Sequence, residues 1–297
     1  MVLRVDLGQS GTRLRMGDIS INSTRGKLAG EQPLSALRSV FEDIEKLSSE
    51  VVALSCTGFG GIVTDPDEFG ALCKEFFGAK KVAVIDDGLA GFFGALHGAN
   101  GVVLSIGGGV VAVGGRDGEF AHRDGLGSTF GDEGGGFWLG KLGITKALAV
   151  RQGRASDADL LEAFHAQLLA YDRLESKNGS EAATLAIESA RTLLDAADSG
   201  AKSAVAIRNE GAHLLAQTVI ATWLGVHGPT DASPQIAIAG GPSANTNYVD
   251  AIQNSIKAAL PNAQFISALG DNLDGALWIA EKLTSDAPPL LRWSHEL

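Results

Sequence analysis

The sequence predicts an α/β protein with two lobes, in each of which strands and helices follow the order βββαβαβα. The first third of the chain shows this order as alternating apolar runs followed by helical spacings. The remainder shows it again, with a long stretch rich in Ala, Leu and Glu inserted. The amino-acid sequence itself shows no repeat. The predicted duplication is therefore one of the order of strands and helices only.

The first lobe is predicted to span residues 1–98. Its first three elements are strands, expected at Val2–Leu7, Thr12–Met16 and Ile19–Asn22. Apolar residues at helical spacing, from Leu34 to Leu47, predict a helix that starts at Pro33. The remaining elements are a strand at Val51–Ser55, a helix at Asp65–Phe77, a strand at Lys81–Ile85 and a helix at Leu89–Leu96.

The second lobe is predicted to span residues 99–297, with a helical insertion at about 137–226. Strands are expected at Gly101–Ile106, Val110–Gly114, Glu119–His122, Gln235–Ala239 and Gln264–Ile266. Outside the insertion, helices are expected at Ala244–Leu260 and Leu273–Lys282. The last of these is also a candidate to return to the first lobe.

Composition limits the function classes. The 297 residues are 45% hydrophobic and carry a net charge of −11 without a basic cluster, so nucleic acid and anionic membranes are poor partners. No apolar run reaches membrane-spanning length, and Arg4 and Asp6 interrupt the N-terminal stretch where a signal peptide needs an apolar core. Cys56 and Cys73 fit a reduced compartment better than a disulfide framework. We therefore expect a cytoplasmic protein.

The first strand runs into a polar turn, Asp6-Leu7-Gly8-Gln9-Ser10-Gly11-Thr12-Arg13. A carboxylate at a strand end, beside backbone N–H and hydroxyl donors, is suited to hold a metal–polyphosphate. Its glycines allow a close approach of the backbone to phosphates. The alternative is an ordinary hairpin with a polar turn.

A second glycine turn, Gly107-Gly108-Gly109, has a rival interpretation. Gly107, Gly109 and Ala112 match the dinucleotide spacing G-x-G-x-x-A after a strand, but that fingerprint must open a helix. Here β-branched residues follow and end in a further turn, which favours strand–turn–strand. The sequence therefore predicts a second phosphate-binding hairpin at the position equivalent to the first.

Asp87 is the candidate catalytic base. It follows a strand and precedes Gly88-Leu89-Ala90-Gly91, small residues that open a helix, where the helix dipole favours an anionic side chain. Phosphoryl transfer needs a carboxylate that orients the attacking hydroxyl and accepts its proton. The alternative is that Asp87 only caps the helix. Alternation places Asp86 on the opposite face.

Two further segments join glycines to the start of a helix. The stretch from Gly127 to Gly140 contains Gly131-Asp132-Glu133-Gly134 and more glycines than helix capping requires, which indicates backbone packed against a ligand. At Ile236–Asn245 an apolar strand meets Gly240-Gly241, where the adenosine of a nucleotide could lie against bare backbone.

Taken together, these motifs resemble the N-acetylglucosamine kinase group within the BadF/BadG/BcrA/BcrD ATPase family, over essentially the whole chain. The most specific part is Gly131-Asp132-Glu133-Gly134 followed by Phe137-Trp138. The resemblance implies two ribonuclease-H-like lobes of the actin, hexokinase and heat-shock ATPase superfamily, facing each other across a nucleotide-binding cleft.

The resemblance also implies ATP- and Mg²⁺-dependent phosphorylation of an amino sugar, N-acetylglucosamine or glucosamine, at its 6-hydroxyl, with Asp87 as base and Asp6 at the metal. The phosphate-binding residues it implies are Gly8, Gln9, Ser10, Thr12, Arg13, Gly107, Gly108 and Gly109. The sugar-binding residues are Gly131, Asp132 and Gly136, and the nucleotide-binding residues are Gly240, Gly241 and Ser243. A homodimer is a further expectation.

The chain departs from the family in two places. The family's second turn usually reads Gly-Thr-Gly-Ser, whereas Gly107-Gly108-Gly109-Val110 lacks these hydroxyls. The loop from Ser23 to Pro33 lacks the Asn that family members tend to carry. These differences bear on the identity of the sugar more than on phosphorylation.

Two alternatives stay open. One is a nucleotide- or sugar-sensing protein of the same fold that closes on ligand without turnover. The other is an ATPase activator of a dehydratase or reductase, which needs cysteines in the second lobe to hold an iron–sulfur cluster, whereas Cys56 and Cys73 lie in the first.

Overall fold

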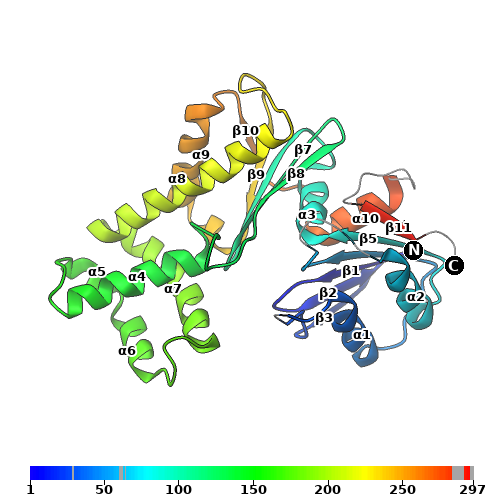
Figure 1. Ribbon diagram of the computed structural model, residues 1–297, viewed down its shortest axis with the longest axis horizontal. Helices are drawn as coiled ribbons and strands as arrows, with labels where there is room; N and C mark the ends of the chain where they lie inside the picture. The colour runs from blue at the N-terminus through cyan, green and yellow to red at the C-terminus, as the bar shows by residue number, and fades with distance from the viewer. Residues whose placement is uncertain (29, 60–62, 64, 283–290, 295–297) are drawn as a thin grey trace. The chain divides into compact units, whose positions relative to one another are not determined.

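The computed structural model describes residues 1–28, 30–59, 63, 65–282 and 291–294 (Figure 1). Its contacts divide the chain into two compact units. Unit 1 comprises Met1–Gly101, Gly115–Phe120 and the chain from Ser267 onward, and unit 2 comprises Val102–Gly114 and Ala121–Ile266. Each unit is built on one sheet.

The sheet of unit 1 has the strand order β11-β5-β4-β1-β2-β3. These strands are β1 (Val2–Leu7), β2 (Thr12–Met16), β3 (Ile19–Ser23), β4 (Val51–Cys56), β5 (Lys81–Asp86) and β11 (Leu291–Ser294). β4 pairs in parallel with both β1 and β5, while β1, β2 and β3 form the expected antiparallel meander. The register sets Asp6 opposite Ser55 and Cys56 opposite Asp86, so the polar ends of three strands lie side by side.

The helices of unit 1 are α1 (Pro33–Asp43), α2 (Pro66–Phe77), α3 (Asp87–Leu96) and α10 (Asn272–Lys282). Figure 1 shows α1 and α2 on one face of the sheet and α3 and α10 on the other. Leu3, Val5 and Leu7 of β1 are fully buried in the core that α1 and α2 cover, as the alternation of apolar residues predicts. The opposite face of β1 carries Arg4 and Asp6, which bond to residues of the α10 region.

The end of α1 and an additional strand differ from the sequence prediction. α1 ends at Asp43 because Ile44 is extended, although the apolar spacing continues to Leu47. Ile44 and Leu47 still pack against the core, which explains why the periodicity is misleading there. Strand β11 was not expected, and it pairs antiparallel with β5.

The sheet of unit 2 has the strand order β10-β9-β6-β7-β8. These strands are β6 (Gly101–Ile106), β7 (Val110–Arg116), β8 (Glu119–Asp124), β9 (Gln235–Ala239) and β10 (Gln264–Ile266). This order matches β5-β4-β1-β2-β3 position for position, so the repeat of elements read from the sequence corresponds to a repeat of topology.

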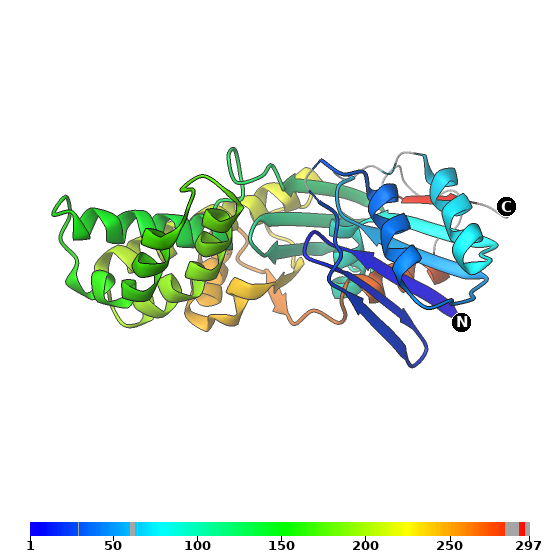
Figure 2. The same ribbon diagram turned by 90° about the horizontal axis from the view of Figure 1, so that it is seen from below.

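The helices of unit 2 are α4 (Gly136–Arg151), α5 (Ala158–Ala163), α6 (His165–Arg173), α7 (Ser180–Asp198), α8 (Lys202–Gly225) and α9 (Thr246–Ala259). The first five fill the region for which the Ala, Leu and Glu content predicts helices, and Figure 2 shows them gathered together. α9 begins two residues later than expected: a 3₁₀ turn occupies Gly241–Ala244, and Asn245 caps the helix by accepting a bond from the Tyr248 N–H at 2.8 Å.

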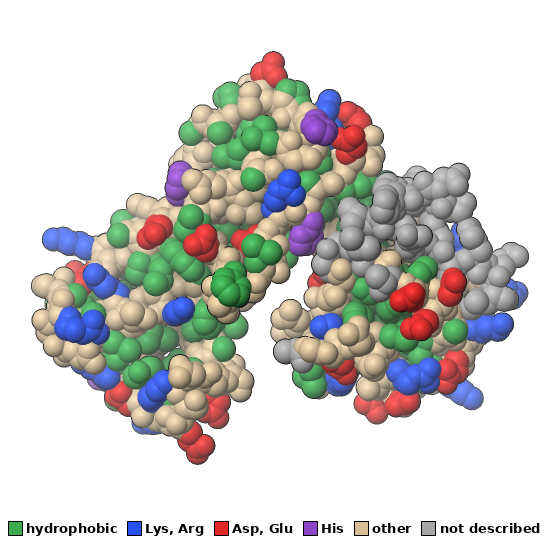
Figure 3. All heavy atoms as spheres, viewed as in Figure 1, with side chains coloured by type: hydrophobic (Ala, Val, Ile, Leu, Met, Phe, Trp, Pro, Cys, Tyr) green, Lys and Arg blue, Asp and Glu red, His purple; other side chains and the backbone are tan. Residues whose placement is uncertain are grey.

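Among the described residues, no helix is both long and apolar enough to cross a membrane. On the face drawn in Figure 3, acidic and basic side chains are interspersed.

Candidate functional site

Asp87 is the first residue of α3, at the end of β5 where the parallel strands of unit 1 terminate. The helix cap is Asp86, whose carboxylate accepts a bond from the Gly88 N–H at 3.0 Å, so the alternative that Asp87 is itself the cap is wrong. Asp86 is 2% exposed, whereas Asp87 is only partly buried. Asp86 therefore holds the helix start, and Asp87 is the less completely buried of the two.

The surroundings of Asp87 make its carboxyl group a weaker acid than an ordinary aspartate. Burial is the main cause and the negative charge of Asp86 the next, and together they raise the pKa of Asp87 to about 7. The charge of Asp6 acts in the same direction, while hydrogen bonds from the Thr57 hydroxyl and the Gly88 N–H oppose it. A carboxyl group with a pKa near neutrality is suited to accept a proton from a hydroxyl.

Asp6 lies on β1 and is 8% exposed. Its Oδ2 is 2.6 Å from Nη2 of Arg13, and its Oδ1 accepts bonds from the Ser55 hydroxyl at 2.9 Å and from the Asn272 amide at 3.2 Å. Nη1 of Arg13 also bonds Asp271, at 2.6 Å. These bonds fix the orientation of the Asp6 carboxylate at the end of the strand.

Asp6 is an oxygen donor of the kind that Mg²⁺ favours, although its Oδ2 is held by Arg13 in this conformation. Mg²⁺ favours oxygen ligands and is commonly held by one or two carboxylates together with phosphates and water. Among the described residues no cluster of three His, Cys, Asp or Glu side chains could hold a metal by itself, so the bound phosphates would have to supply further ligands. When bound, the ion would neutralise the charge of the phosphate oxygens.

The turn between β1 and β2 is closed by a bond from the Gly8 N–H to the Gly11 carbonyl at 2.9 Å. Gln9 and Ser10 are exposed at its tip. Thr12 differs, because it is 1% exposed and its hydroxyl donates to the Arg25 carbonyl at 2.7 Å. In this conformation Gln9 and Ser10 offer side chains to a ligand, whereas the Thr12 hydroxyl stabilises the unit.

The second turn joins β6 to β7, so the strand–turn–strand prediction is confirmed and the dinucleotide fingerprint is excluded. The Gly107 N–H donates to the Gly109 carbonyl at 2.8 Å. The carbonyls of Gly107 and Gly108 accept bonds from the N–H groups of Gly136 and Phe137, at 2.8 and 2.9 Å. The start of α4 is thereby anchored on the turn.

Asp132 is attached to the same turn. It is 8% exposed, and its Oδ1 accepts a bond from the Val110 N–H at 2.9 Å. A Cβ on Gly109 would lie 2.6 Å from Oδ2 of Asp132, so a side chain there would require the Asp132 carboxylate to move. Burial and the charge of Asp124 raise the pKa of Asp132, against the lowering effect of the Val110 bond. The carboxylate predicted to bind sugar thus also braces the turn predicted to bind phosphate.

A cavity of about 560 Å³ lies within unit 2 beside this turn. Four of its lining residues were predicted at the site: Gly107, Gly108, Gly136 and Gly241. The others are Ile187, Glu188, Ala190, Arg191, Leu194, Asp195, Pro242, Ala244 and Asn245. The cavity brings together the predicted phosphate turn and the predicted adenosine turn, which are more than a hundred residues apart in the chain.

Gly240 explains why the two turns adjoin. Its φ is +107°, and a Cβ there would lie 2.1 Å from the Ile106 carbonyl oxygen, so glycine lets the end of β9 lie directly on the end of β6. The Ser243 hydroxyl donates to the Gly240 carbonyl at 2.7 Å and so shapes the turn.

Gly131 lies in the loop before α4, where the Asp132 N–H donates to Asp124 at 2.9 Å.

Sequence reasoning missed the α7 side of the cavity and also missed Thr57. The α7 residues belong to the predicted insertion and carry no glycine signal, although their helical spacing would place them on one face. Thr57 follows β4 directly, and only the strand register shows that it lies near Asp87.

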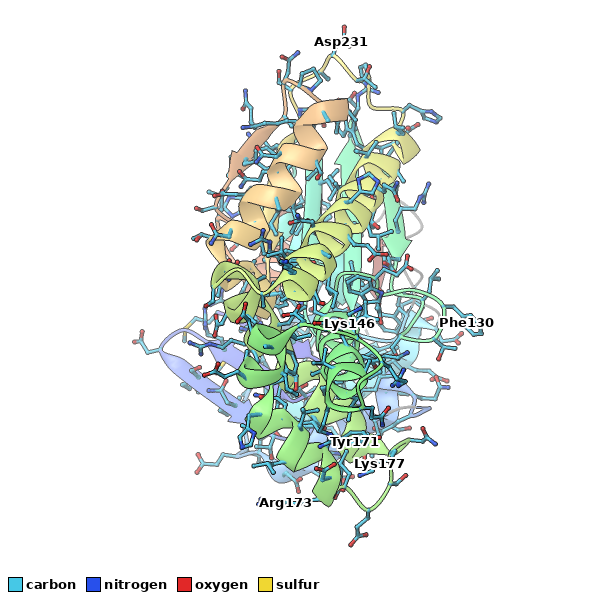
Figure 4. All side chains as sticks on the ribbon, turned by 90° about the vertical axis from the view of Figure 1, so that its left-hand side faces the viewer. Phe130, Lys146, Tyr171, Arg173, Lys177 and Asp231 are labelled. Atoms are coloured by element: carbon cyan, nitrogen blue, oxygen red, sulfur yellow. The ribbon has the colours of Figure 1, made fainter. Side chains whose placement is uncertain are left out.

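Figure 4 shows Phe130, which is 85% exposed, projecting from the loop between β8 and α4.

The two sheets of matching order, each with a glycine-containing hairpin turn, define a duplicated α/β protein. The sequence profile of the BadF/BadG/BcrA/BcrD ATPase family matches residues 1–277, and the chain belongs to this family. A comparison with curated proteins gave no match.

Solved structures share the fold. A candidate N-acetylglucosamine kinase from Chromobacterium violaceum is 18% identical, with 94% of this chain and 98% of that chain covered and a TM-score of 0.66. A candidate N-acetylglucosamine kinase from Porphyromonas gingivalis is 14% identical, with 95% and 99% covered and a TM-score of 0.65. A ROK family glucokinase from Streptomyces griseus, solved with glucose and AMPPNP, is 16% identical, with 94% and 98% covered and a TM-score of 0.56. The predicted fold class is confirmed.

Proposed function

We propose that this protein is an ATP-dependent kinase that transfers a phosphoryl group to the 6-hydroxyl of an amino sugar, N-acetylglucosamine or glucosamine. Membership in an ATPase family supports ATP as the nucleotide. The similar structures include a glucokinase bound to glucose and a non-hydrolysable ATP analogue, which supports a sugar as the acceptor. One observation carries the proposal: a partly buried aspartate, Asp87, stands at a helix start with a pKa of about 7.

In the proposed reaction, a carboxylate oxygen of Asp87 accepts a hydrogen bond from the sugar hydroxyl and orients its oxygen for attack on the γ-phosphorus. As the O–P bond forms, the proton passes to Asp87 and ADP leaves. The cavity of unit 2 would hold the nucleoside beside Gly241, with the Gly107-Gly108 turn next to the phosphates. Asp6 would hold the Mg²⁺ that accompanies ATP.

The test is a screen of N-acetylglucosamine, glucosamine, N-acetylmannosamine, glucose and fructose at saturating magnesium–ATP. We expect one sugar phosphate per ADP with an amino sugar, and two-dimensional ¹H–³¹P NMR should place the phosphate on C6. Phosphate on another carbon would contradict the 6-hydroxyl assignment. Glucose as the best acceptor would contradict the amino sugar assignment while leaving the kinase proposal intact.

A second candidate is a protein that binds nucleotide and sugar without turnover. It is favoured by the second turn, which offers only glycines where hydroxyl side chains are usual. Tight ATP binding without ADP formation across all five sugars would support it. The ATPase-activator alternative receives no support, because the thiols of Cys56 and Cys73 are both buried inside unit 1. A cytoplasmic location and a homodimeric state stay predictions.

A further inference from the structure

We propose that Lys27 is a further catalytic residue of the proposed kinase site: its ammonium group binds the γ-phosphate of ATP and stabilises the phosphoryl group during transfer. The inference rests on the proposed function, because it needs ATP as the ligand. The chemical step is the one given above: the sugar oxygen bonds to the γ-phosphorus, the bond from phosphorus to the β-phosphate oxygen breaks, and Asp87 takes the proton. Lys27 donates hydrogen bonds and keeps its own protons.

The loop that carries Lys27 is docked on the glycine turn between β1 and β2. The Lys27 N–H donates to the Gly8 carbonyl at 2.9 Å. The buried hydroxyl of Thr12 donates to the Arg25 carbonyl at 2.7 Å. Between these two bonds, a Cβ on Gly26 would collide with the backbone of the turn. These contacts fix the backbone of Lys27 against the turn that is predicted to bind phosphate.

The side chain of Lys27 extends from this loop to the end of β4. Gly58, the second residue after β4, has a φ of +96°, and a Cβ there would lie 2.5 Å from Cε and 3.0 Å from Nζ of Lys27. Glycine therefore leaves the space in which the lysine stem lies along the backbone. Lys27 is half-buried, and its ammonium group is held beside the chain that leaves the carboxyl end of β4.

Asp87 lies at the same end of the sheet. The parallel pairing of β4 with β5 sets Cys56 opposite Asp86, so the residues that follow these two leave the sheet side by side. Asp87 directly follows Asp86, and Gly58 follows Cys56 by two positions. In the proposed reaction the γ-phosphorus comes to about 3 Å from the hydroxyl oxygen that Asp87 orients. The γ-phosphate therefore enters the end of the sheet at which the Lys27 ammonium group lies.

The arginines of β1 and β2 are already neutralised by carboxylates. Arg13 lies between Asp6 and Asp271, with a nitrogen–oxygen distance of 2.6 Å to each. Arg4 is paired with Asp274 at 3.1 Å. A phosphate would have to displace a carboxylate to reach either guanidinium group.

Lys27 differs from these arginines. In its own loop, Glu31 is paired with Arg25, and the pKa of Glu31 is lowered chiefly by that bond and only slightly by the charge of Lys27. From β5 and α3 come Asp86, whose carboxylate caps the helix, and Asp87, the proposed base. No ion pair of Lys27 occurs within the described part of the chain. A cationic side chain in this position can stabilise the charge on the oxygens of a phosphoryl group in transfer.

Lys27→Met tests the inference, because methionine keeps an unbranched stem beside Gly58 and removes the ammonium group. Lys27→Gln replaces it if the methionine variant does not fold, and Lys27→Arg restores a positive charge. Lys46→Met is the matched control. Lys46 is an exposed lysine of unit 1 that lines a groove with Phe76 and Phe77 of α2.

The direct readout is calorimetric titration with ADP and with AMPPNP, an ATP analogue that retains a γ-phosphate, both with Mg²⁺ and without sugar. We expect Lys27→Met to bind AMPPNP at least about tenfold more weakly and ADP as the wild type does, because one charged hydrogen bond to the γ-phosphate is lost. Lys27→Arg should recover part of the AMPPNP affinity, and Lys46→Met should bind both nucleotides normally. Equal losses for AMPPNP and ADP, or no loss, would overturn the inference.

If the wild type phosphorylates a sugar, kcat should fall about 10²- to 10³-fold in Lys27→Met, with the KM for the sugar unchanged. A raised KM for the sugar with unchanged kcat would place Lys27 at the acceptor and contradict the proposed contact. A wild type that binds AMPPNP but forms no sugar phosphate would refute the kinase proposal, while the comparison of AMPPNP with ADP would still decide the role of Lys27.

Discussion

Asp87→Asn should make unit 1 more stable at pH 8 while removing the proposed base. The pKa of Asp87 is raised from 3.8 to about 7, mainly by burial. A raised folded-state pKa means that the protonated form is favoured by folding, so its stabilising effect is complete below pH 4 and is lost as the pH rises to about 7. Asparagine is neutral and nearly isosteric, and it avoids this loss at every pH.

The magnitude follows from the shift. A shift of about three pKa units corresponds to roughly 4 kcal/mol as an upper bound, and partial exposure with local relaxation reduces this to on the order of 2 kcal/mol. The gain should be present at pH 8, smaller at pH 6 and absent near pH 4. This pH dependence separates it from an improvement in packing, which would not vary with pH.

The assay is native-state hydrogen exchange, read on peptides from β4, β5 and α3, because a protein with two compact units need not unfold in one step. Asp67→Asn is the matched control, since Asp67 also lies in the first turn of a helix of unit 1 but is exposed. Equal stability of Asp87→Asn and the wild type at pH 8, or a gain that persists unchanged at pH 4, would refute the reasoning.

Three further predictions concern the proposed catalytic and nucleotide sites. The kcat/KM of the wild type should fall about tenfold per pH unit below pH 7, because only ionised Asp87 accepts a proton; a flat profile between pH 5.5 and 7.5 would exclude this role. Gly240→Ala should weaken ATP binding by at least about tenfold in calorimetry, because its Cβ would lie 2.1 Å from the Ile106 carbonyl oxygen and the turn must move; unchanged affinity would separate the turn from the nucleotide. Asp6→Asn should raise the Mg²⁺ concentration for half-maximal turnover by roughly tenfold, since a neutral amide is a poorer ligand than a carboxylate; an unaltered Mg²⁺ dependence would remove Asp6 from the metal.

Much of the fold could be predicted because alternation along a strand reports which face is buried. Leu3, Val5 and Leu7 alternate with polar residues, and the structure buries them. Boundaries were less predictable, since they depend on local capping. The apolar spacing at Ile44 and Leu47 continues beyond the end of α1 because both residues contact the core from a non-helical segment.

The residues of the candidate site could be proposed from the sequence where their signal is local. The glycine turn at 107–109 and Gly240 are such signals, because close backbone approach requires glycine. The α7 residues Ile187 and Leu194 reach the cavity only through the packing of an inserted helix, which no local motif records. Thr57 reaches Asp87 only through the register of neighbouring strands. Tertiary pairing therefore supplies the part of the site that motifs do not.

The central claim is that Asp87 accepts the proton of a sugar hydroxyl during phosphoryl transfer from ATP. The most direct measurement compares sugar phosphate formation by the wild type and Asp87→Asn at pH 8 under saturating magnesium–ATP, with ATP binding measured on both. We predict stoichiometric sugar phosphate and ADP from the wild type, and turnover lower by about 10²- to 10⁴-fold in the variant with ATP affinity unchanged. Full turnover in Asp87→Asn would contradict the account.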